Sequence, residues 1–271
     1  ILDRLTMRTI SSKQNRLIAT FKDTATRSNP DDDRILLEGV HLIREAQTAG
    51  ISIHIVAVSK EQLEANSEVS MLAQEFHTAG SDVVLASNQI MKLLSPAKTP
   101  QGIVAVAVRS YDDLKTLFHH PKTLIVIAAD IQDPGNLGAL LRTSEAGGAT
   151  GVIVCGKSAD PLTWKALRGS MGSALRLPIA RLKTAEDAIQ ITQKHGFAVV
   201  AAVPRGGKSP KKIDWLKHKA VLFGGEGQGL SEQTVAHCDE KVTVPMSAPV
   251  ESLNIAVAAG LIVYEASRQC L

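Results

Sequence analysis

Short apolar runs alternate with amphipathic stretches along most of the chain. Continuous apolar runs are typical of buried strands, and apolar positions three and four residues apart are typical of helices. The apolar runs predict strands at residues 34–38, 53–58, 83–86, 103–108, 124–129, 151–155, 198–203, 221–223 and 241–244. The amphipathic stretches predict helices at residues 41–49, 69–79, 88–94, 112–120, 137–146, 162–167, 185–195 and 231–237. This alternation indicates an α/β fold with parallel sheets and right-handed crossovers.

The chain divides near residues 109–121, where a short connector separates two series of strands and helices. The first series contains no paired acids, histidine cluster or nucleophile motif, so we interpret it as a binding domain. The expected domains are residues 1–109 and 122–271, joined by the connector 110–121. Near the start, Leu17, Ile18 and Phe21 form one apolar stripe under a basic helix face. That face is either an RNA contact or an ordinary solvated surface.

Residues 221–230 run from an apolar strand into a cluster of glycines around Glu226. Glycine permits positive φ and a close approach to a ligand, and turns after buried strands are where α/β proteins bind ligands. The dinucleotide pattern G-x-G-x-x-G fails, because Leu230 stands where its last glycine would be. A carboxylate in the loop would repel a phosphate, so the loop suits a hydroxyl, an amine or a positive charge. The alternative is a surface turn with an exposed Glu226.

A further strand ends at Pro245, and a helix of small residues follows from about Glu251. Ser252 and Asn254 are polar residues that open this otherwise apolar helix. Either could be its N-cap. Two such residues indicate that one of them faces something else, such as a ligand.

Residues 130–142 directly follow the first strand of the second domain. Residues 133–136 have the composition of a turn, and Asn136 is placed to open the next helix. Arg142 lies six residues further on, beside Leu140 and Leu141. It is either a rim residue that covers the core with its stem or a residue that faces the ligand loop.

Basic residues gather in two parts of the second domain, although the net charge of the chain is only +3. One series comprises Lys157, Lys165, Arg168, Arg176, Arg181 and Lys183. The other comprises Arg205, Lys208, Lys211, Lys212, Lys217 and Lys219, which face only Asp214. Such series favour RNA or DNA over a small molecule, the alternative being solvated loop charge. The aromatic content of 3% argues against base stacking as the way of holding a nucleic acid.

Several common kinds of site are excluded by spacing. Residues 204–210 imitate a phosphate loop but lack its first glycine, and residues 169–173 do not form a nucleophile elbow. The cysteines, Cys155, Cys238 and Cys270, are too scattered for a disulfide framework or a zinc site, so no metal is expected. No apolar run is long enough to span a membrane, and no signal-peptide pattern opens the chain. We therefore expect a cytoplasmic protein without a membrane partner.

Taken together, three blocks resemble the SpoU (also called TrmH) family of RNA 2′-O-ribose methyltransferases, within the SPOUT class. The blocks carry Pro134, Asn136, Gly138 and Arg142, then Gly224, Glu226, Gly229 and Leu230, then Val244-Pro-Met246 with Ser252-Leu-Asn254. Their order and spacing match the family's. Residues 36–39 and 99–102 resemble the family's N-terminal substrate-binding domain, which is similar to ribosomal protein L30e.

The resemblance implies a C-terminal parallel-sheet domain with a deep trefoil knot, which general topology rules would not suggest. It also implies S-adenosylmethionine as methyl donor and a homodimer with active sites at the subunit interface. The implied reaction, of class EC 2.1.1, methylates a ribose 2′-hydroxyl of structured RNA, with 23S-type ribosomal RNA favoured over transfer RNA. The alternatives are a transfer RNA 2′-O-methyltransferase and a non-catalytic L30e-like RNA-binding protein. The absent dinucleotide pattern disfavours an oxidoreductase.

The resemblance also implies roles for individual residues. The catalytic positions are Arg142, Asn136, Glu226, Ser252 and Asn254. The cofactor-binding positions are Phe223, Gly224, Gly225, Gly227, Val244, Met246, Ser247 and Leu253. Arg142 is the family's candidate for activating the hydroxyl. Because an arginine stays protonated, we expect it to act as an electrostatic clamp on the attacking oxygen rather than as a base.

Overall fold

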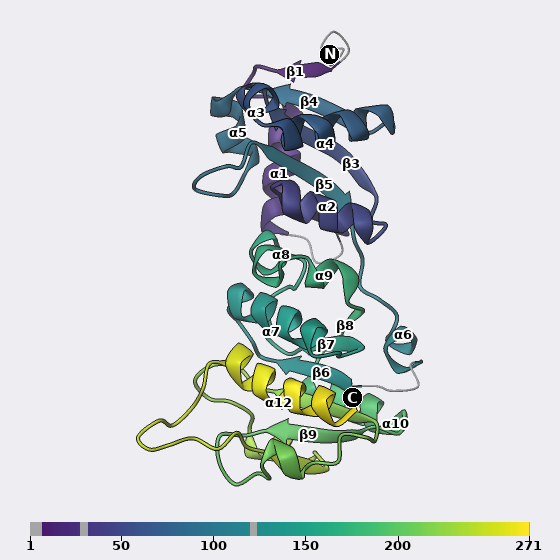
Figure 1. The fold of residues 1–271 in the computed structure, drawn as a ribbon, viewed down its shortest axis with the longest axis vertical. Helices are drawn as coiled ribbons and strands as arrows, with labels where there is room; N and C mark the ends of the chain where they lie inside the picture. Colours follow the sequence, from purple (N-terminus) through teal and green to yellow (C-terminus); the bar gives the residue numbers. More distant parts are fainter. Residues whose placement is uncertain (1–6, 28–31, 120–123, 271) are drawn as a thin grey trace. The chain divides into compact units, whose positions relative to one another are not determined.

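The structure is a computed structural model that describes residues 7–27, 32–119 and 124–270. The chain folds into two compact units. One unit comprises the described residues of Ile1–Ser110 together with Leu162–Arg176. The other comprises those of Tyr111–Pro161 and Leu177–Leu271. Each unit consists of one β-sheet with helices packed against it (Figure 1).

The first unit is built on a five-stranded sheet in the order β1-β4-β3-β5-β2. The strands are β1 (Arg8–Ile10), β2 (Arg34–Glu38), β3 (Ile53–Ser59), β4 (Asp82–Ala86) and β5 (Ile103–Val108). Strand β5 runs antiparallel to both of its neighbours, and the other pairs are parallel. The predicted strands of this unit are confirmed. Strand β1 is not predicted from the sequence, because three residues are too short a run to show a period.

Helices α1 and α5 cover one face of this sheet, where Phe21 and Leu94 are buried among strand residues. The helices of the unit before the connector are α1 (Arg16–Thr26), α2 (Val40–Thr48), α3 (Lys60–Ala65), α4 (Ser67–Thr78) and α5 (Asn88–Leu94). The apolar stripe predicted for α1 is confirmed, since Ile18 and Phe21 face the core. Helix α3 is not predicted, and Asn66 then caps the start of α4 with its side chain.

A short segment from the second half of the chain belongs to this first unit. Helices α8 (Trp164–Ser170) and α9 (Ser173–Arg176) pack there, and α8 contacts β2. Trp164 lies against the core of the unit, and Arg176 forms an ion pair with Glu45. This grouping differs from the division expected from the sequence, which assigns every residue after the connector to the second domain. An aromatic side chain at the start of a short helix does not reveal which core it joins.

The second unit is built on a six-stranded, entirely parallel sheet in the order β11-β9-β10-β6-β7-β8. Its strands are β6 (Leu124–Ala129), β7 (Gly151–Cys155), β8 (Ile179–Arg181), β9 (Ala198–Ala202), β10 (Lys219–Phe223) and β11 (Glu240–Val242). The parallel α/β architecture predicted for this part of the chain is confirmed. Strand β8 is not predicted from the sequence.

The helices of this unit include a long pair, α7 (Pro134–Ala146) and α12 (Ile255–Cys270), which pack against each other (Figure 1). The shorter helices are α6 (Leu114–Phe118), α10 (Ala185–Lys194), α11 (Glu232–Ala236) and the 3₁₀ turn η1 (Pro210–Lys212). Helix α6 is shorter than the predicted helix 112–120, whose last residue lies outside the described residues. No helix in the described ranges is long and apolar enough to cross a membrane.

The starts of two helices differ from the expectation at residues of interest. Helix α7 begins at Pro134, and Asp133 is its cap because its carboxylate accepts the Asn136 backbone N–H at 2.8 Å. Asn136 therefore lies inside the first turn, with its side chain available for other contacts. Helix α12 begins at Ile255, so Ser252 lies in the loop before it, and Asn254 accepts the Ala256 N–H at 2.9 Å as a cap does.

Candidate active site

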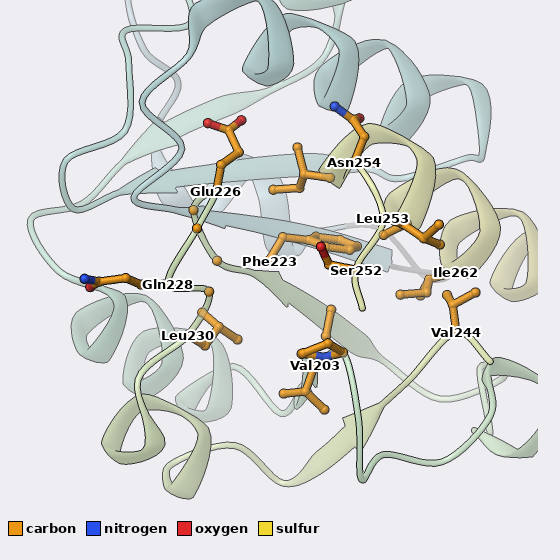
Figure 2. Close-up of a pocket in the computed structure, with 18 of the residues that line it drawn as sticks. Val203, Phe223, Glu226, Gln228, Leu230, Val244, Ser252, Leu253, Asn254 and Ile262 are labelled. Carbon is orange, nitrogen blue, oxygen red and sulfur yellow. The ribbon is translucent and has the colours of Figure 1, made fainter. Parts of the chain in front are cut away.

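The carboxyl ends of the six parallel strands meet at one edge of the second sheet, where α/β proteins bind ligands. A cavity of about 560 Å³ lies at this edge, within the usual range for small-molecule sites. Its lining comes from residues 202–204 at the end of β9, residues 223–230 at the end of β10, and parts of segments 242–246 and 252–262. Apolar side chains such as Phe223 and Ile262 dominate the interior (Figure 2).

The glycine loop, residues 224–229, forms one wall of the cavity. The Gly229 N–H donates to the Gly225 carbonyl at 3.1 Å, which closes the loop into a tight turn. Gly227 and Gly229 have φ of 96° and 64°, where a side chain would be strained. A Cβ on Gly224 would lie 2.6 Å from the Gly229 carbonyl carbon, so the backbone closes on itself there. The prediction that these glycines serve close backbone approach at a ligand site agrees with this geometry.

Three polar side chains from distant segments form a chain of hydrogen bonds beside this loop. The Asn136 amide nitrogen donates to a Glu226 carboxylate oxygen at 2.5 Å. The Asn254 amide nitrogen donates to the Asn136 carbonyl oxygen at 3.1 Å. Glu226 and Asn254 both line the cavity and lie on the same side of it, whereas Gln228 points away (Figure 2). Asn136 is therefore the link that holds the glycine loop and the start of α12 together through their side chains.

The residues of this network can form further hydrogen bonds with a bound polar group. Each amide nitrogen of Asn136 and Asn254 has two N–H groups and uses one in the network, and Glu226 retains a second carboxylate oxygen. All three side chains remain partly or largely exposed to solvent. The site therefore offers both donors and an acceptor to a hydroxyl-bearing ligand, next to an apolar cavity.

Most of the residues predicted to hold a cofactor do line the cavity. These are Phe223, Gly224, Gly225, Gly227, Val244, Met246 and Leu253. Of the predicted catalytic residues, Ser252 also lines it, together with Glu226 and Asn254. Ser247 does not: it is exposed in the loop before α12, where its carbonyl accepts the Val250 N–H at 3.1 Å.

Two predicted catalytic residues, Asn136 and Arg142, are not among the residues that line the cavity. Asn136 bonds to the lining residues Glu226 and Asn254. Arg142 is exposed on α7. Six residues separate it from Asn136, which is about 120° around a helix and about 9 Å along it. Its side chain makes no hydrogen bond or ion pair with any residue that the structure describes.

Other lining residues are not predicted from the sequence. Val203 and Pro204 lie directly after β9, next to β10 in the sheet, and both line the cavity. The end of the predicted strand 198–203 carries a signal for them, because neighbouring parallel strands end at the same edge. The helix residues Ile255, Ala258 and Ile262 share one face of α12. Their spacing predicts a covered face but does not indicate what covers it.

The basic series 205–219 is partly neutralised, contrary to the expectation that it faces only Asp214. Glu240 accepts Lys208 at 2.7 Å and also pairs with the buried Lys219. The hydrogen bond from Lys208, followed by that from Lys219, lowers the pKa of Glu240 below its usual value. Two of the six cations are therefore structural. Their partner lies in β11, far along the sequence, which is why spacing alone cannot reveal it.

Cysteine chemistry is not supported at Cys155 or Cys238. Burial raises the pKa of the Cys155 thiol to about 12 and that of Cys238 to about 11, so neither is a thiolate near neutral pH. Within residues 7–27, 32–119 and 124–270, no group of three or more His, Cys, Asp or Glu side chains is arranged to hold a metal ion.

Each half of the chain matches the model of a known protein family. The SpoU rRNA Methylase family model matches residues 123–264, and the MRM3-like substrate binding domain model matches residues 18–105. A protein of Synechocystis described as a tRNA/rRNA methyltransferase is 31% identical over 96% of this chain and 93% of its own length. A 23S rRNA guanosine 2′-O-methyltransferase of Bacillus subtilis is 28% identical over 95% of this chain and 98% of its own.

Solved structures agree over nearly the whole chain. An S-adenosylmethionine-bound rRNA methyltransferase from Sinorhizobium meliloti superposes with a TM-score of 0.85 at 26% identity, covering 98% of this chain and 99% of its own. A SpoU methyltransferase from Streptomyces viridochromogenes in complex with the same cofactor gives 0.84 at 26% identity, over 95% and 98% of the two chains. The fold, the glycine loop and these matches agree, and the chain belongs to the SpoU rRNA methylase family.

Proposed function

We propose that this protein transfers a methyl group from S-adenosylmethionine to a ribose 2′-hydroxyl of ribosomal RNA. The observation that carries the proposal is the hydrogen-bonded series Asn254–Asn136–Glu226 at the edge of the glycine-loop cavity. Groups that donate and accept at such an edge suit a hydroxyl nucleophile, which must be oriented before it can attack. A relative of nearly equal length is a 23S rRNA 2′-O-methyltransferase, which supports this choice of acceptor over transfer RNA.

The cavity fits S-adenosylmethionine, whose adenine ring has apolar faces and whose sulfonium is cationic. Apolar residues such as Phe223 and Leu230 suit the adenosine, and the glycine loop presents backbone groups without a phosphate site. The Glu226 carboxylate lines the cavity and would favour a positive charge beside it. When bound there, this cofactor supplies the electrophilic methyl group. Phe223, Gly224, Gly225, Gly227, Val244, Met246 and Leu253 would hold it.

Asn136, Glu226, Ser252 and Asn254 would orient the ribose and the cofactor. Hydrogen bonds to Glu226 and from Asn254 fix the Asn136 side chain, so it is positioned before a substrate arrives. Preorganised groups of this kind lower the barrier because they need no rearrangement during the reaction. The guanidinium of Arg142 would stabilise the negative charge that develops on the attacking oxygen, since arginine cannot serve as a base.

Arg142 can reach a cavity if two chains form a homodimer through α7 and α12. Val257, Leu261 and Tyr264 form an apolar stripe on α12 and are 51%, 48% and 67% exposed. Helix α12 packs on α7 so closely that a Cβ on Gly260 would lie 3.4 Å from the Thr143 methyl group, next to Arg142 in sequence. A second copy covering this stripe would bury it and would place Arg142 of one chain near the cavity of the other.

Residues 1–109 would select the RNA, and residues 122–271 would carry out the transfer. The first unit contains the substrate-binding match, and the cavity lies wholly in the second unit. A non-catalytic RNA-binding protein is disfavoured, because such a protein would have no need to bring Asn136, Glu226 and Asn254 together.

The direct test is methylation of purified 23S rRNA and of transfer RNA with S-adenosylmethionine labelled in its methyl group. We expect label in 23S rRNA, in a nucleotide that resists alkaline cleavage on its 3′ side. An Asn136→Ala variant should lose the activity, whereas Gln233→Ala, which removes an exposed amide on α11, should keep it. Activity should persist in excess chelator. Label on a base, or in transfer RNA alone, would contradict the proposed substrate.

A further inference from the structure

Asp130 is a non-glycine residue with left-handed backbone geometry, with φ of 59°, directly after β6. Aspartate tolerates this geometry better than most residues, but at a cost that the surroundings must offset. Asp130 is not one of the residues that line the cavity. Its backbone conformation therefore needs a reason other than ligand contact.

The Asp130 carbonyl touches the glycine loop. A Cβ on Gly225 would overlap the Asp130 carbonyl oxygen and lie 2.9 Å from its carbonyl carbon. Only glycine at 225 allows this close approach, and the carbonyl faces it because of the left-handed turn at 130. The loop after β6 and the loop after β10 are thus in contact through their backbones.

The carboxylate of the same residue is bonded on the other side, to the loop after β7. It accepts the Lys157 N–H at 2.7 Å. The following residue, Ile131, donates its N–H to Ser158 Oγ at 3.0 Å and accepts the Ala159 N–H at 2.8 Å. Ile131 itself is fully buried. Asp130 is consequently held by its side chain to one loop while its carbonyl supports another.

We infer that Asp130 is a positioning residue that sets the distance between Asn136 and Glu226. Glu226 adjoins Gly225, and Asn136 lies in the first turn of the helix that the Asp130 loop leads into. The contact at Gly225 therefore spaces the two segments whose side chains bond at 2.5 Å. This inference rests on the proposed methyl transfer, because the network it positions is the one assigned to the ribose hydroxyl.

Three substitutions separate the backbone from the carboxylate. Asp130→Asn keeps an acceptor oxygen and tolerates the left-handed geometry, so its turnover should stay within about threefold of wild type. Asp130→Gly keeps the geometry and loses the acceptor, and should be intermediate. Asp130→Ala loses both and should lower kcat about 10- to 100-fold, the effect of a misplacement of about 1 Å. Binding of S-adenosylhomocysteine, measured by calorimetry, should change by less than about threefold in Asp130→Asn.

A second readout does not depend on activity. The side-chain amide signals of Asn136, assigned by their loss in Asn136→Asp, should shift in Asp130→Ala and stay in place in Asp130→Asn. A merely destabilising role would lower the melting temperature but leave the kcat of the folded protein and these signals unchanged.

The two readouts separate failure of the inference from failure of the proposed function. If the wild-type protein methylates RNA, a normal kcat in Asp130→Ala overturns the positioning role. If the wild-type protein methylates no RNA, the proposed function falls, and the amide signals still decide the geometry: an unshifted Asn136 amide in Asp130→Ala overturns the inference.

Discussion

The glycine-loop cavity and the exposed surface of α7 both carry residues that the family resemblance implies for catalysis. The two regions differ in whether these residues contact one another within one chain. At the cavity, Asn136, Glu226 and Asn254 are already bonded to one another. On α7, Arg142 is exposed and lies outside the cavity lining. The proposed cofactor end of the site thus lies within one chain, whereas the proposed charge for the nucleophile lies outside the cavity lining. The exposed stripe on α12 makes a second chain the simplest candidate for bringing the two together.

Arg142→Ala should have the largest effect on activity. If Arg142 stabilises charge on the attacking oxygen, kcat should fall by about 10²–10⁴, the usual loss when one positioned charge is removed. The cofactor dissociation constant should change by less than about threefold, or roughly 0.7 kcal/mol. Lysine should rescue only partly, because a point charge cannot replace the guanidinium fork. Single-turnover methylation measures the step directly. A near-normal rate would show that Arg142 is not catalytic and only covers the core with its stem. Lys194→Ala on α10 is the matched control.

A mixed dimer tests whether Arg142 acts on the cavity of the other chain. Differently tagged Arg142→Ala and Asn136→Ala chains are co-expressed, and the species carrying both tags is purified. If Arg142 acts across the interface, one of the two sites has both residues intact, and activity should recover to about half of wild type. If Arg142 acts within its own chain, each site is defective and the mixed species is as inactive as its parents. Failure of the tags to co-purify would contradict the dimer.

Leu261→Asp should disrupt the proposed dimer while leaving both the cavity and Arg142 unchanged. A buried, unpaired carboxylate in the proposed interface opposes association, so the protein should run as a monomer by light scattering. Methylation should then fall about 100-fold, toward the level of Arg142→Ala, because the cavity loses its partner arginine. Cofactor binding should persist, since the cavity belongs to one chain. Leu216→Asp, at a residue 72% exposed elsewhere, should change neither property. A monomer with full activity would contradict the role of the interface.

Gly224→Ala should weaken cofactor binding at the cavity without changing the α7 surface. The added Cβ would lie 2.6 Å from the Leu230 nitrogen and from the Gly229 carbonyl carbon, both backbone atoms. Overpacking of this kind costs about 1–3 kcal/mol, so the dissociation constant for S-adenosylhomocysteine should rise about 5- to 150-fold. Calorimetry measures it, with light scattering to show that the oligomeric state is unchanged. Unaltered cofactor binding would show that the loop yields easily or that the cofactor lies elsewhere.

Glu240→Gln should lower the free energy of unfolding without changing the cavity or Arg142. The hydrogen bonds from Lys208 and Lys219 lower the pKa of Glu240 below its usual 4.5, so they stabilise the fold above that pH. This contribution is lost as the pH falls through the lowered folded-state pKa. The variant should lose about 1–3 kcal/mol at neutral pH, because Lys219 is buried, and less in acid. Melting temperatures at neutral and acid pH measure the difference, and an equal loss at both would contradict it.

The sequence predicts the cavity better than it predicts its surroundings, for a local reason. Gly224, Gly227 and Gly229 adopt geometries that only glycine tolerates well, so the residue types themselves report a special turn. The start of α7 is harder, because Asp133 and Asn136 are both good caps and only the folded chain shows that Asp133 takes this role. Segment 162–176 is harder still, since nothing in Trp164 indicates which of two cores it joins. The trefoil knot and the homodimer remain predictions.

The α/β class, most strands and helices, and the family are predictable from the sequence, because they depend on periodicity and on residue types at fixed short spacings. Which of the candidate residues meet depends on the packing of distant segments. Asn136 lies 90 residues from Glu226 and 118 from Asn254. They meet because β10 pairs with β6 in the sheet and α12 packs on α7, pairings that no local pattern specifies. The same order leaves Arg142 on the outer surface of α7, a position fixed by which side of the helix faces the core.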